Sequence, residues 1–571
     1  MEVELRWGIR IPLRDGVHLQ ATVYLPPPQQ VPAPTVVALT PYLADFHHER
    51  GMFFARHGLP FLIVDVRGRG NSEGQFRPFI QEAKDGFDVV EWAAQQPYCN
   101  GQVALWGGSY LGYVQWAVAK EFPPHLATII PVAAPHIGVD FPMRNNIFYP
   151  YALQWLFLTS GRTSQNKTSS DGQFWSAIYR KWCESGRPFA ELDRLVGEPS
   201  VHFQQWLRHP ELGSYWDDYN PTPEQYSQLQ LPILTLTGTY DDDQPGALEH
   251  YKEYMRHAAP AARSQHHLVI GPWDHARMGG PQASFGGLKC GAASLIDLNQ
   301  LHLEWYAWTM QEGPKPAFLK KAVAYYVTGA DQWKYADTLD TVTAAHQPLY
   351  LDSAGQANDV FCAGYLKPVP GNGPPDGYQY DPSDTRAPEI EAETRAEGGS
   401  LVDQSLTYAL GGRELVYHSA RLEREVEVSG FFKLRAWISI DTPDTDFYIS
   451  VYEIAPDGSA LVLSTDAMRA RYREGLRGPK LISTDEPLCY EFERFTFVAR
   501  RIGRGCRLRL VIAPVGRLIG AAFVQKNFNG GGPVAAESAR EARPVQVRLF
   551  HDAKHPSVLF VPLGHKDECL I

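Results

Sequence analysis

Short runs of consecutive apolar residues alternate with helical patterns over the first 135 positions of the chain. The runs lack the apolar–polar alternation of a half-exposed strand, which is typical of parallel strands buried on both faces. They comprise residues 35–39 (TVVAL), 61–66 (FLIVDV) and 103–106 (VALW). Helical spacing follows at residues 82–96 and 110–120, so strands and helices alternate along the chain. This order predicts a doubly wound α/β domain, preceded by two alternating strands that join at Arg14-Asp15-Gly16.

The pattern changes between residues 136 and 220. Aromatic residues are frequent there, helical spacing dominates, and buried-strand runs are absent. The α/β pattern then resumes with apolar strands at 231–237 and 267–270. We therefore predict a discontinuous α/β domain at residues 1–135 and 221–344, with a helical cap inserted at 136–220.

Beyond residue 345 the chain consists of short alternating strands and turns. Examples of the strands are PLYLDS, LVYHS, FFKLRAWISI, DFYISVYEI and CRLRLVIA. Pro456-Asp457-Gly458 is a typical turn between two of them. The pattern predicts a C-terminal β jelly roll or sandwich at 345–571. Residues 364–400, rich in proline, glycine and aspartate, are predicted to form a long loop between domains.

The composition narrows the classes of partner and location. A formal net charge of −11 disfavours nucleic acid as a partner, because phosphate binding needs a basic surface. No apolar run approaches the about 20 residues of a membrane helix, and the N-terminal residues lack the segments of a signal peptide. The seven cysteines are scattered and match neither a disulfide framework nor a zinc motif. We expect a cytoplasmic protein without membrane contact, metal or cofactor; the sequence leaves open whether it forms a homo-oligomer.

Ser109 follows the third buried run, within the segment ALWGGSYLG. Sheets of this type place their chemistry at the carboxyl ends of the strands. A nucleophilic serine at a sharp strand-to-helix turn needs small neighbours, and Gly107 and Gly108 precede it. The usual glycine two positions after the serine is replaced by Leu111, and Gly112 follows. The motif alone does not decide whether Ser109 is a nucleophile or a helix-capping serine.

Two further residues supply what a nucleophilic serine requires. A hydroxyl attacks when a histidine takes its proton, and a carboxylate must orient that histidine. Asp241 follows the strand LPILTLT and His275 follows the strand HLVI, in the chain order serine, acid, histidine. Taken singly, Asp241 could cap a loop and His275 could be a structural histidine. The three residues together predict a triad of Ser109, Asp241 and His275.

Motifs spread along the chain extend this pattern. They are TPY at 40–42, DVRGRGNSEG at 65–74, GGSYLG at 107–112, YD at 240–241, IGPWDH at 270–275, DTD at 444–446 and RARYR at 469–473. In these motifs the sequence resembles the cocaine esterase-like (CocE/NonD) serine hydrolases, which are grouped with the X-prolyl dipeptidyl peptidases and the α-amino acid ester hydrolases. The resemblance covers essentially the whole chain. It implies an α/β-hydrolase domain with an inserted helical cap, followed by a C-terminal jelly-roll domain, and glycine three places after the serine is the family's own pattern.

The resemblance also implies a role for each matching residue. Ser109 would be the nucleophile, Asp241 the orienting carboxylate, and His275 the general base and then the general acid. The phenol of Tyr42 and the backbone N–H of Tyr110 would stabilise the oxyanion, since unpaired amides at a helix N-terminus favour negative charge. A core tyrosine with a satisfied hydroxyl is the competing interpretation of Tyr42.

The substrate is less determined than the chemistry. An aromatic cap over the serine suggests an apolar acyl or leaving group, with Trp155 as a candidate lining residue. In relatives the jelly roll also reaches the site, which makes the loop at 398–402 a further candidate, with Leu401 and Val402 as its binding residues.

Carboxylates near the predicted triad separate the subfamilies. The α-amino acid ester hydrolases carry two acidic residues one spacer after their catalytic acid; here Asp243 matches as a substrate-binding residue and Gln244 breaks the pair. Those relatives carry another carboxylate in the cap, for which Asp217 and Asp218 are candidates. A small-molecule carboxylic ester is therefore favoured over an amide or peptide substrate. An acyltransferase that uses the same acyl-serine remains an alternative, and the intact predicted site argues against a non-catalytic binding protein.

Overall fold

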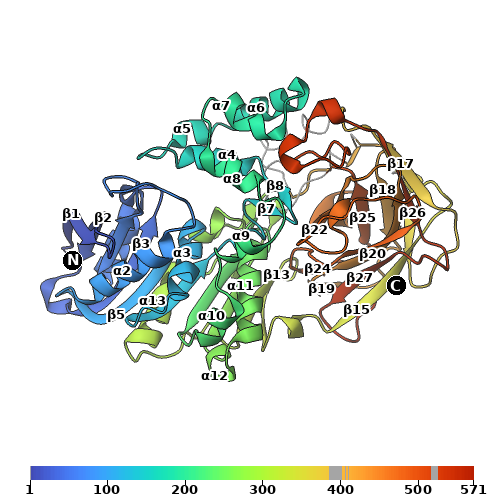
Figure 1. Cartoon of the computed structure of the whole chain (residues 1–571). Helices are drawn as coiled ribbons and strands as arrows, with labels where there is room; N and C mark the ends of the chain where they lie inside the picture. The colour runs from blue at the N-terminus through green and yellow to red at the C-terminus, as the bar shows by residue number, and fades with distance from the viewer. Residues whose placement is uncertain are drawn as a thin grey trace.

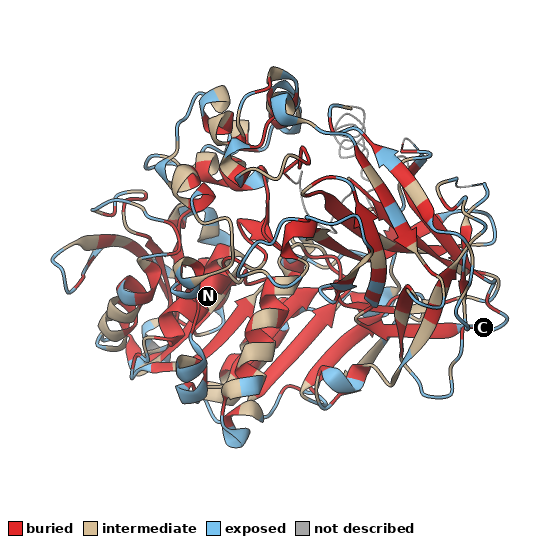
Figure 2. Ribbon diagram, turned by 45° about the vertical axis from the view of Figure 1, so that its right-hand side comes forward, coloured by how far each residue is buried: buried red, intermediate tan, exposed pale blue. Residues whose placement is uncertain are grey.

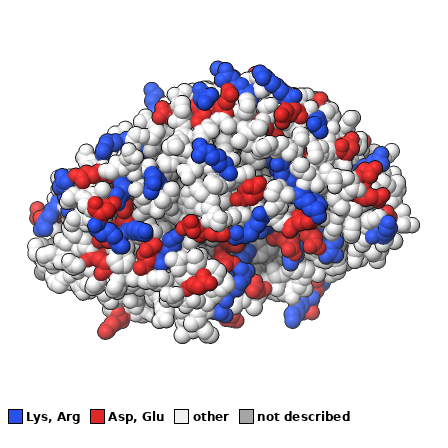
Figure 3. Space-filling model, in the orientation of Figure 1, with Lys and Arg blue, Asp and Glu red and all other residues white. Residues whose placement is uncertain are grey.

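The computed structural model describes residues 2–359, 361–384, 401–404, 407–408, 410–515 and 525–570. Three groups of elements are visible in Figure 1: an N-terminal α/β unit, a helical cap above it, and a C-terminal β unit on the right. Basic and acidic side chains are interspersed on the face drawn in Figure 3. Within the described ranges, no helix combines the length and apolar character needed to cross a bilayer.

The α/β unit is built on one mixed sheet. Its strands are β1 (Glu4–Pro12), β2 (His18–Leu25), β3 (Ala33–Thr40), β4 (Phe61–Asp65), β5 (Cys99–Gly108), β6 (Leu126–Val132), β9 (Ile233–Gly238), β10 (His266–Gly271), β13 (Val323–Val327) and β14 (Gln332–Ala336). They lie in the order β1-β2-β4-β3-β5-β6-β9-β10-β13-β14, and the strands from β4 to β13 run parallel. The predicted buried runs form β3, β4 and β5, and the predicted N-terminal strand pair forms β1 and β2. The predicted α/β class is confirmed.

Helices pack around this sheet and shield it from solvent. They are α1 (His48–Arg56), α2 (Glu82–Ala94), α3 (Tyr110–Ala119), α10 (Pro223–Gln228), α11 (Gln244–His257), α12 (Pro260–Arg263) and α13 (Leu298–Met310). Figure 2 shows the strands buried and the helices partly exposed. All residues of β3, β4, β9 and β10 are buried, which is why these segments carry no polar alternation.

The cap is mainly helical. Its elements are β7 (Met143–Arg144), β8 (Ile147–Phe148), α4 (Tyr151–Leu158), α5 (Asn166–Ser169), α6 (Gly172–Ser185), α7 (Leu192–Val196), α8 (Val201–Leu207) and α9 (Ser214–Asp217). Trp182, Trp206 and Trp216 are almost fully buried and form much of its core. The predicted cap also contains a short element that the sequence did not indicate: β7 and β8 form a hairpin with positive φ at Asn145 and Asn146. Strands of two residues are too short to produce a periodic signal.

The C-terminal unit has the predicted strand-rich jelly-roll architecture. Its strands are β15 (Ala345–Asp352), β16 (Gly364–Lys367), β17 (Asp376–Tyr380), β18 (Leu415–Ser419), β19 (Val426–Gly430), β20 (Lys433–Ile440), β21 (Asp446–Ile454), β22 (Ala460–Arg469), β23 (Leu488–Phe492), β24 (Val498–Ile502), β25 (Arg507–Ala513), β26 (Val545–Phe550) and β27 (Val558–Leu563). The prediction of a loop over 364–400 is wrong for its first part. There β16 pairs with β15 and β18, and β17 pairs with β26, so distant partners override the turn-rich composition.

Buried ion pairs join the end of β22 to its surroundings. Arg469 Nε lies 2.8 Å from Oδ1 of Asp446, with both side chains almost fully buried. Arg471 Nε lies 2.8 Å from Oδ2 of Asp444. The acidic residues of the DTD motif therefore pair with the arginines of the RARYR motif.

Candidate active site

Ser109 lies between β5 and α3 in a backbone conformation that few residues adopt. Its φ is 60° and its ψ is −125°. A positive φ costs energy for any residue other than glycine, and such strain occurs preferentially at functional sites. The Ser109 amide donates to the carbonyl of Val132 at 2.9 Å, and its own carbonyl accepts the amide of Gly112 at 2.8 Å. The turn is thereby fixed on both sides.

Close packing explains the glycines around this serine. Gly107 has a φ of 139°, and a Cβ there would collide with the side chain of Leu111. A Cβ on Gly112 would lie 2.6 Å from the carbonyl oxygen of Val132, at the end of β6. Helix α3 therefore passes close to the sheet at the third place after the serine, while Leu111 fills the space against Gly107.

Asp241 and His275 come together at the carboxyl ends of β9 and β10. The distance from His275 Nδ1 to Asp241 Oδ1 is 2.8 Å. Asp241 is fully buried, and its other oxygen accepts the hydroxyl of Thr237 at 3.2 Å. The amide of Asp243 donates to Asp241 Oδ1 at 3.1 Å. These bonds fix the carboxylate, which in turn orients the imidazole so that its Nε2 is free for proton transfer.

Two further carboxylates surround the imidazole. His275 Nδ1 lies 3.4 Å from Asp242 Oδ1 and 3.7 Å from Asp243 Oδ2. Burial alone would lower the pKa of His275, but the negative charges of its aspartate neighbours, Asp242 foremost, outweigh it and raise that pKa well above its usual value. Among the described residues, Asp241, Asp242 and His275 also form a set whose ligand atoms lie within 4.8 Å of one another. Within that set His275 Nδ1 is already hydrogen-bonded to Asp241 Oδ1.

Tyr42 follows β3 and faces the serine. The indole Nε1 of Trp155 donates to its phenol oxygen at 2.9 Å. Burial raises the pKa of Tyr42 to about 12, while hydrogen bonds with Trp155 and Ser109 act in the opposite direction. Tyr42 is therefore a neutral hydrogen-bond donor at neutral pH, as an oxyanion donor must be.

Tyr110 is the first residue of α3, so its backbone N–H is one of the unpaired donors of that helix. Its side chain is anchored elsewhere: the hydroxyl donates to Glu82 of α2 and accepts the amide of Phe79 at 3.2 Å. Burial raises the pKa of Glu82 to about 7. The tyrosine ring thus braces the start of α3, and its amide remains available to a ligand.

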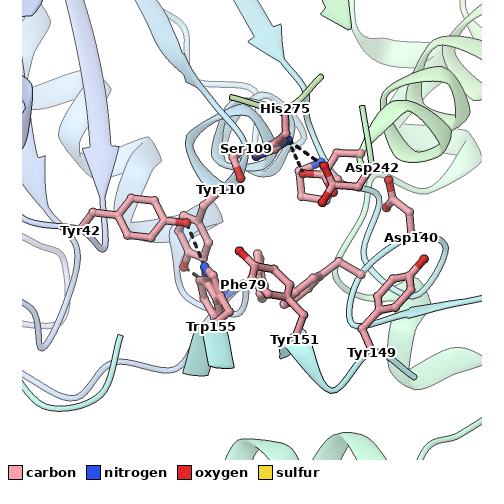
Figure 4. A pocket seen from close by; sticks show the side chains of 13 residues that line it. Tyr42, Phe79, Ser109, Tyr110, Asp140, Tyr149, Tyr151, Trp155, Asp242 and His275 are labelled. Atoms are coloured by element: carbon pink, nitrogen blue, oxygen red, sulfur yellow. Dashed lines mark hydrogen bonds and ion pairs between the residues drawn. The ribbon is translucent and has the colours of Figure 1, made fainter. Parts of the chain in front are cut away.

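Ser109, His275, Tyr42 and Tyr110 line one cavity, whereas the buried Asp241 lies behind His275 and outside the lining. Figure 4 shows Ser109 and His275 at the top, Tyr42 and Trp155 at the left, and Asp140 with Tyr149 at the right. The lining consists of Tyr42, Phe79, Ser109, Tyr110, Pro135, Asp140, Phe141, Tyr149, Tyr151, Trp155, Asp242, Asp243 and His275. The chain segments that the sequence singled out therefore converge beneath the cap.

Some sequence-based candidates lie elsewhere. Leu401 packs in the core of the β unit, where its amide donates to the carbonyl of Gly286 at 3.0 Å, and Val402 packs against Gly287. Neither lines the cavity, and residues 398–400 of that loop lie outside the described residues. Asp217 also lies outside the lining, since its carboxylate pairs with Arg477 at 2.7 Å on the surface.

Two lining carboxylates, Asp242 and Asp140, have no assigned role in the sequence analysis, and Asp140 lies far from the predicted triad along the chain. It lies in the segment after β6, is 2% exposed, and accepts the amides of His136 at 2.8 Å and Gly246 at 2.6 Å. The expectation that Asp217 or Asp218 takes this place is wrong, because neither lines the cavity. No local motif marks Asp140, because its position is set by its hydrogen bonds in the folded protein.

Gln244 is also explained by its contacts. Its side chain is fully buried, donating to the carbonyls of Gly238 and Thr239 at 3.1 and 2.9 Å. It also accepts the amide of Phe497 at 2.7 Å. Gln244 thus joins the triad loop to the β unit and does not line the cavity.

Comparisons with known proteins agree with this arrangement. The family model of X-Pro dipeptidyl-peptidase (S15 family) matches residues 15–277, and that of the X-Pro dipeptidyl-peptidase C-terminal non-catalytic domain matches residues 319–515. The cocaine esterase of Rhodococcus sp. (strain MB1 Bresler) is 26% identical over 585 residues, which cover 97% of this chain and 98% of the relative.

Solved structures share the fold over nearly the whole chain. An α-amino acid ester hydrolase has a TM-score of 0.83 at 19% identity, covering 98% of this chain and 96% of its own. An aminopeptidase from the marine sediment archaeon Thaumarchaeota archaeon has a TM-score of 0.82 at 22% identity, with the same two coverages. The chain therefore carries an S15-type domain and a PepX_C-type C-terminal domain, is similar over nearly its whole length to a cocaine esterase, and is identified as a hydrolytic enzyme.

Proposed function

We propose that this enzyme hydrolyses small-molecule carboxylic esters through an acyl-enzyme intermediate on Ser109. The observation that carries the proposal is the shared cavity. A serine in a strained turn and a histidine held by Asp241 line it together with Tyr42. This combination supplies a nucleophile, a base and an oxyanion donor from three chain segments that line the same cavity.

In the proposed reaction, Ser109 Oγ attacks the ester carbonyl while His275 Nε2 accepts its proton. The oxyanion of the tetrahedral intermediate accepts hydrogen bonds from the Tyr42 hydroxyl and the Tyr110 amide. The intermediate collapses when His275 returns the proton to the leaving alkoxide, which departs as an alcohol. Water, activated by the same histidine, then releases the acid and restores Ser109.

Product partitioning tests the proposal. Esters that share one acyl group but differ in leaving group should give the same ratio of methyl ester to acid when methanol is added, because all pass through one acyl-enzyme. The Ser109→Ala variant serves as the inactive control. A partition ratio that changes with the leaving group would contradict a common acyl-serine. Ester formed in preference to acid at low alcohol concentration would favour the acyltransferase alternative.

A second candidate substrate class follows from the carboxylates of the cavity. Asp140, Asp242 and Asp243 line it, and no lysine or arginine is among the described lining residues. Burial raises the pKa of Asp242 to about 6 and those of Asp140 and Asp243 well above their usual value. A substrate ammonium in the cavity would relieve this penalty by charge pairing. We therefore propose an ester or amide of an amine-bearing acyl group as the alternative substrate.

A matched pair of substrates separates the two candidates. Phenylglycine ethyl ester and phenylacetic acid ethyl ester differ only by the amino group. If the carboxylates bind an ammonium, the first should have the higher kcat/KM, and Asp243→Asn should lower its value much more than that of the second. Equal kcat/KM values and equal losses would favour the simple carboxylesterase. The corresponding anilides test amide cleavage in the same assay.

A further inference from the structure

The oxyanion donor of the proposed site is held by the cap. Resting on the proposed function, we infer that Trp155 is a positioning residue: its indole N–H occupies a lone pair of the Tyr42 phenol oxygen and so turns the phenol hydrogen toward the oxyanion. Trp155 belongs to α4 of the cap, whereas Tyr42 follows β3 of the α/β unit. The oxyanion site is then completed only when these two parts are in contact.

The direction of the hydrogen bond decides this role. An indole N–H can only donate, whereas a phenol can both donate and accept. The 2.9 Å bond from Trp155 Nε1 to Tyr42 Oη therefore leaves the hydrogen of the phenol uncommitted to the indole. Figure 4 shows this bond on the side of Tyr42 away from His275, so the remaining donor direction lies toward the serine.

The aromatic packing fixes the plane of the indole. Trp155 is 5% exposed. Its ring stacks on Phe79, with centroids 5.2 Å apart and planes inclined by 26°, and on Tyr110, with centroids 5.6 Å apart and planes inclined by 19°. Such contacts restrict rotation of the side chain. The indole N–H of Trp155 therefore has a defined direction. A residue that only lines the cavity would not need its N–H to be oriented.

The backbones of the two segments are fastened by a buried arginine. Arg69 is fully buried, and its Nε donates to the carbonyl of Pro41 at 2.7 Å. Its Nη1 donates to the carbonyl of Thr159, at the end of α4, also at 2.7 Å. The Ser164 hydroxyl adds a bond of 3.2 Å to the Tyr42 carbonyl. The side-chain bond from Trp155 is thus supported by the Arg69 bridge between the two segments and by the direct bond from Ser164 to Tyr42.

Loss of the indole donor should act on turnover through Tyr42. Without it the phenol can rotate and spend part of its time donating away from the oxyanion. Since the oxyanion forms only in the transition state, kcat should fall while KM changes little. A residue that only shapes the cavity would instead alter KM and would act independently of Tyr42.

A double-mutant cycle with an isosteric replacement tests the inference. Trp155 is replaced by β-(3-benzothienyl)alanine, in which sulfur stands in place of the N–H, in the wild-type and Tyr42→Phe backgrounds. We expect kcat to fall by about 5- to 30-fold in the first background, the usual effect of one hydrogen bond, and by less than about 2-fold in the second. Trp155→Phe provides a genetically simple second variant. Tyr149→Phe, which removes a hydroxyl from the opposite side of the same cavity without touching the Trp155–Tyr42 bond, is the matched control and should act equally in both backgrounds.

The outcomes are distinct. An unchanged kcat for the isosteric variant, or an equal loss in both backgrounds, would overturn the positioning role. A Tyr42→Phe variant with normal turnover would overturn it as well, since there would be no oxyanion donor to position. The acyl-enzyme proposal would not be decided by that result, because the partition ratio and the labelling of Ser109 test it independently. Thermal unfolding of each variant confirms that the folded state is retained.

Discussion

His275 Nδ1 lies 3.4 Å from Asp242 Oδ1, although its hydrogen bond is to Asp241 at 2.8 Å. The proposed catalytic base therefore faces two more carboxylates than orientation requires, since Asp243 Oδ2 also lies 3.7 Å from its Nδ1. Excess negative charge beside an imidazole stabilises its protonated form. His275 must be neutral to accept a proton, so the neighbouring carboxylates oppose its role as a base at low pH.

The pH dependence of kcat/KM should reveal this surplus charge. The pKa of His275 is raised, so kcat/KM should rise with pH until the imidazole loses its proton. Asp242→Asn removes a negative charge, lowers that pKa, and should move the acid limb to lower pH. Asp274→Asn is the matched control, because Asp274 is paired with Arg277 and should leave the limb in place. A shift to higher pH in Asp242→Asn would contradict the assignment of His275 as the base.

If Tyr42 stabilises the oxyanion, removal of its hydroxyl should have a large effect on kcat. Tyr42→Phe should reduce kcat by about 100- to 1000-fold with little change in KM, the usual consequence of removing one oxyanion donor. Tyr149→Phe is the control, since Tyr149 lines the same cavity on the side of Asp140. Steady-state hydrolysis of an activated ester measures both. Comparable losses in the two variants would identify Tyr42 as a lining residue only.

The turn at Ser109 should not tolerate a side chain at Gly112. A Cβ there would lie 2.6 Å from the Val132 carbonyl oxygen and 3.1 Å from Ala134. We expect Gly112→Ala to displace α3, and with it the Tyr110 amide, so that kcat falls together with the thermal stability. Gly172→Ala serves as the control, because nothing lies within 4 Å of a Cβ at Gly172, the first residue of α6. Full activity in Gly112→Ala would show that the close approach is dispensable.

The buried pair of Arg469 and Asp446 should matter more for stability than an exposed pair of the same length. Asp446→Ala leaves a buried arginine without its nearest partner and should lower the free energy of unfolding by about 3–5 kcal/mol. Arg435 and Glu491 are also 2.8 Å apart, but both side chains are about half exposed. Glu491→Ala should therefore cost less than about 1 kcal/mol. Denaturant unfolding of both variants compares the two, and equal costs would contradict the argument from burial.

The predicted triad depended on local signals. Ser109 directly follows β5, and Asp241 and His275 lie a few residues beyond the ends of β9 and β10; these strands are recognisable because they are largely apolar. Parallel neighbours then bring their carboxyl ends to one edge. The elbow glycines add a second local signal, since close packing excludes a side chain there.

Residues that depend on distant packing could not be found in this way. Asp140 leaves no pattern in the sequence around it, because its position is set by amides from two separate segments. Leu401 occupies the core of the β unit rather than the cavity. Strands β16 and β17 form in a turn-rich segment because other strands pair with them. In each case the deciding interaction is tertiary.

The site of covalent labelling tests the central claim most directly. After reaction with a fluorophosphonate, peptide mass spectrometry of the inactivated enzyme should place one adduct on Ser109. The Ser109→Ala variant should remain unlabelled, and His275→Ala should label far more slowly. An adduct on another residue, or persistent ester hydrolysis by the fully labelled protein, would contradict the account.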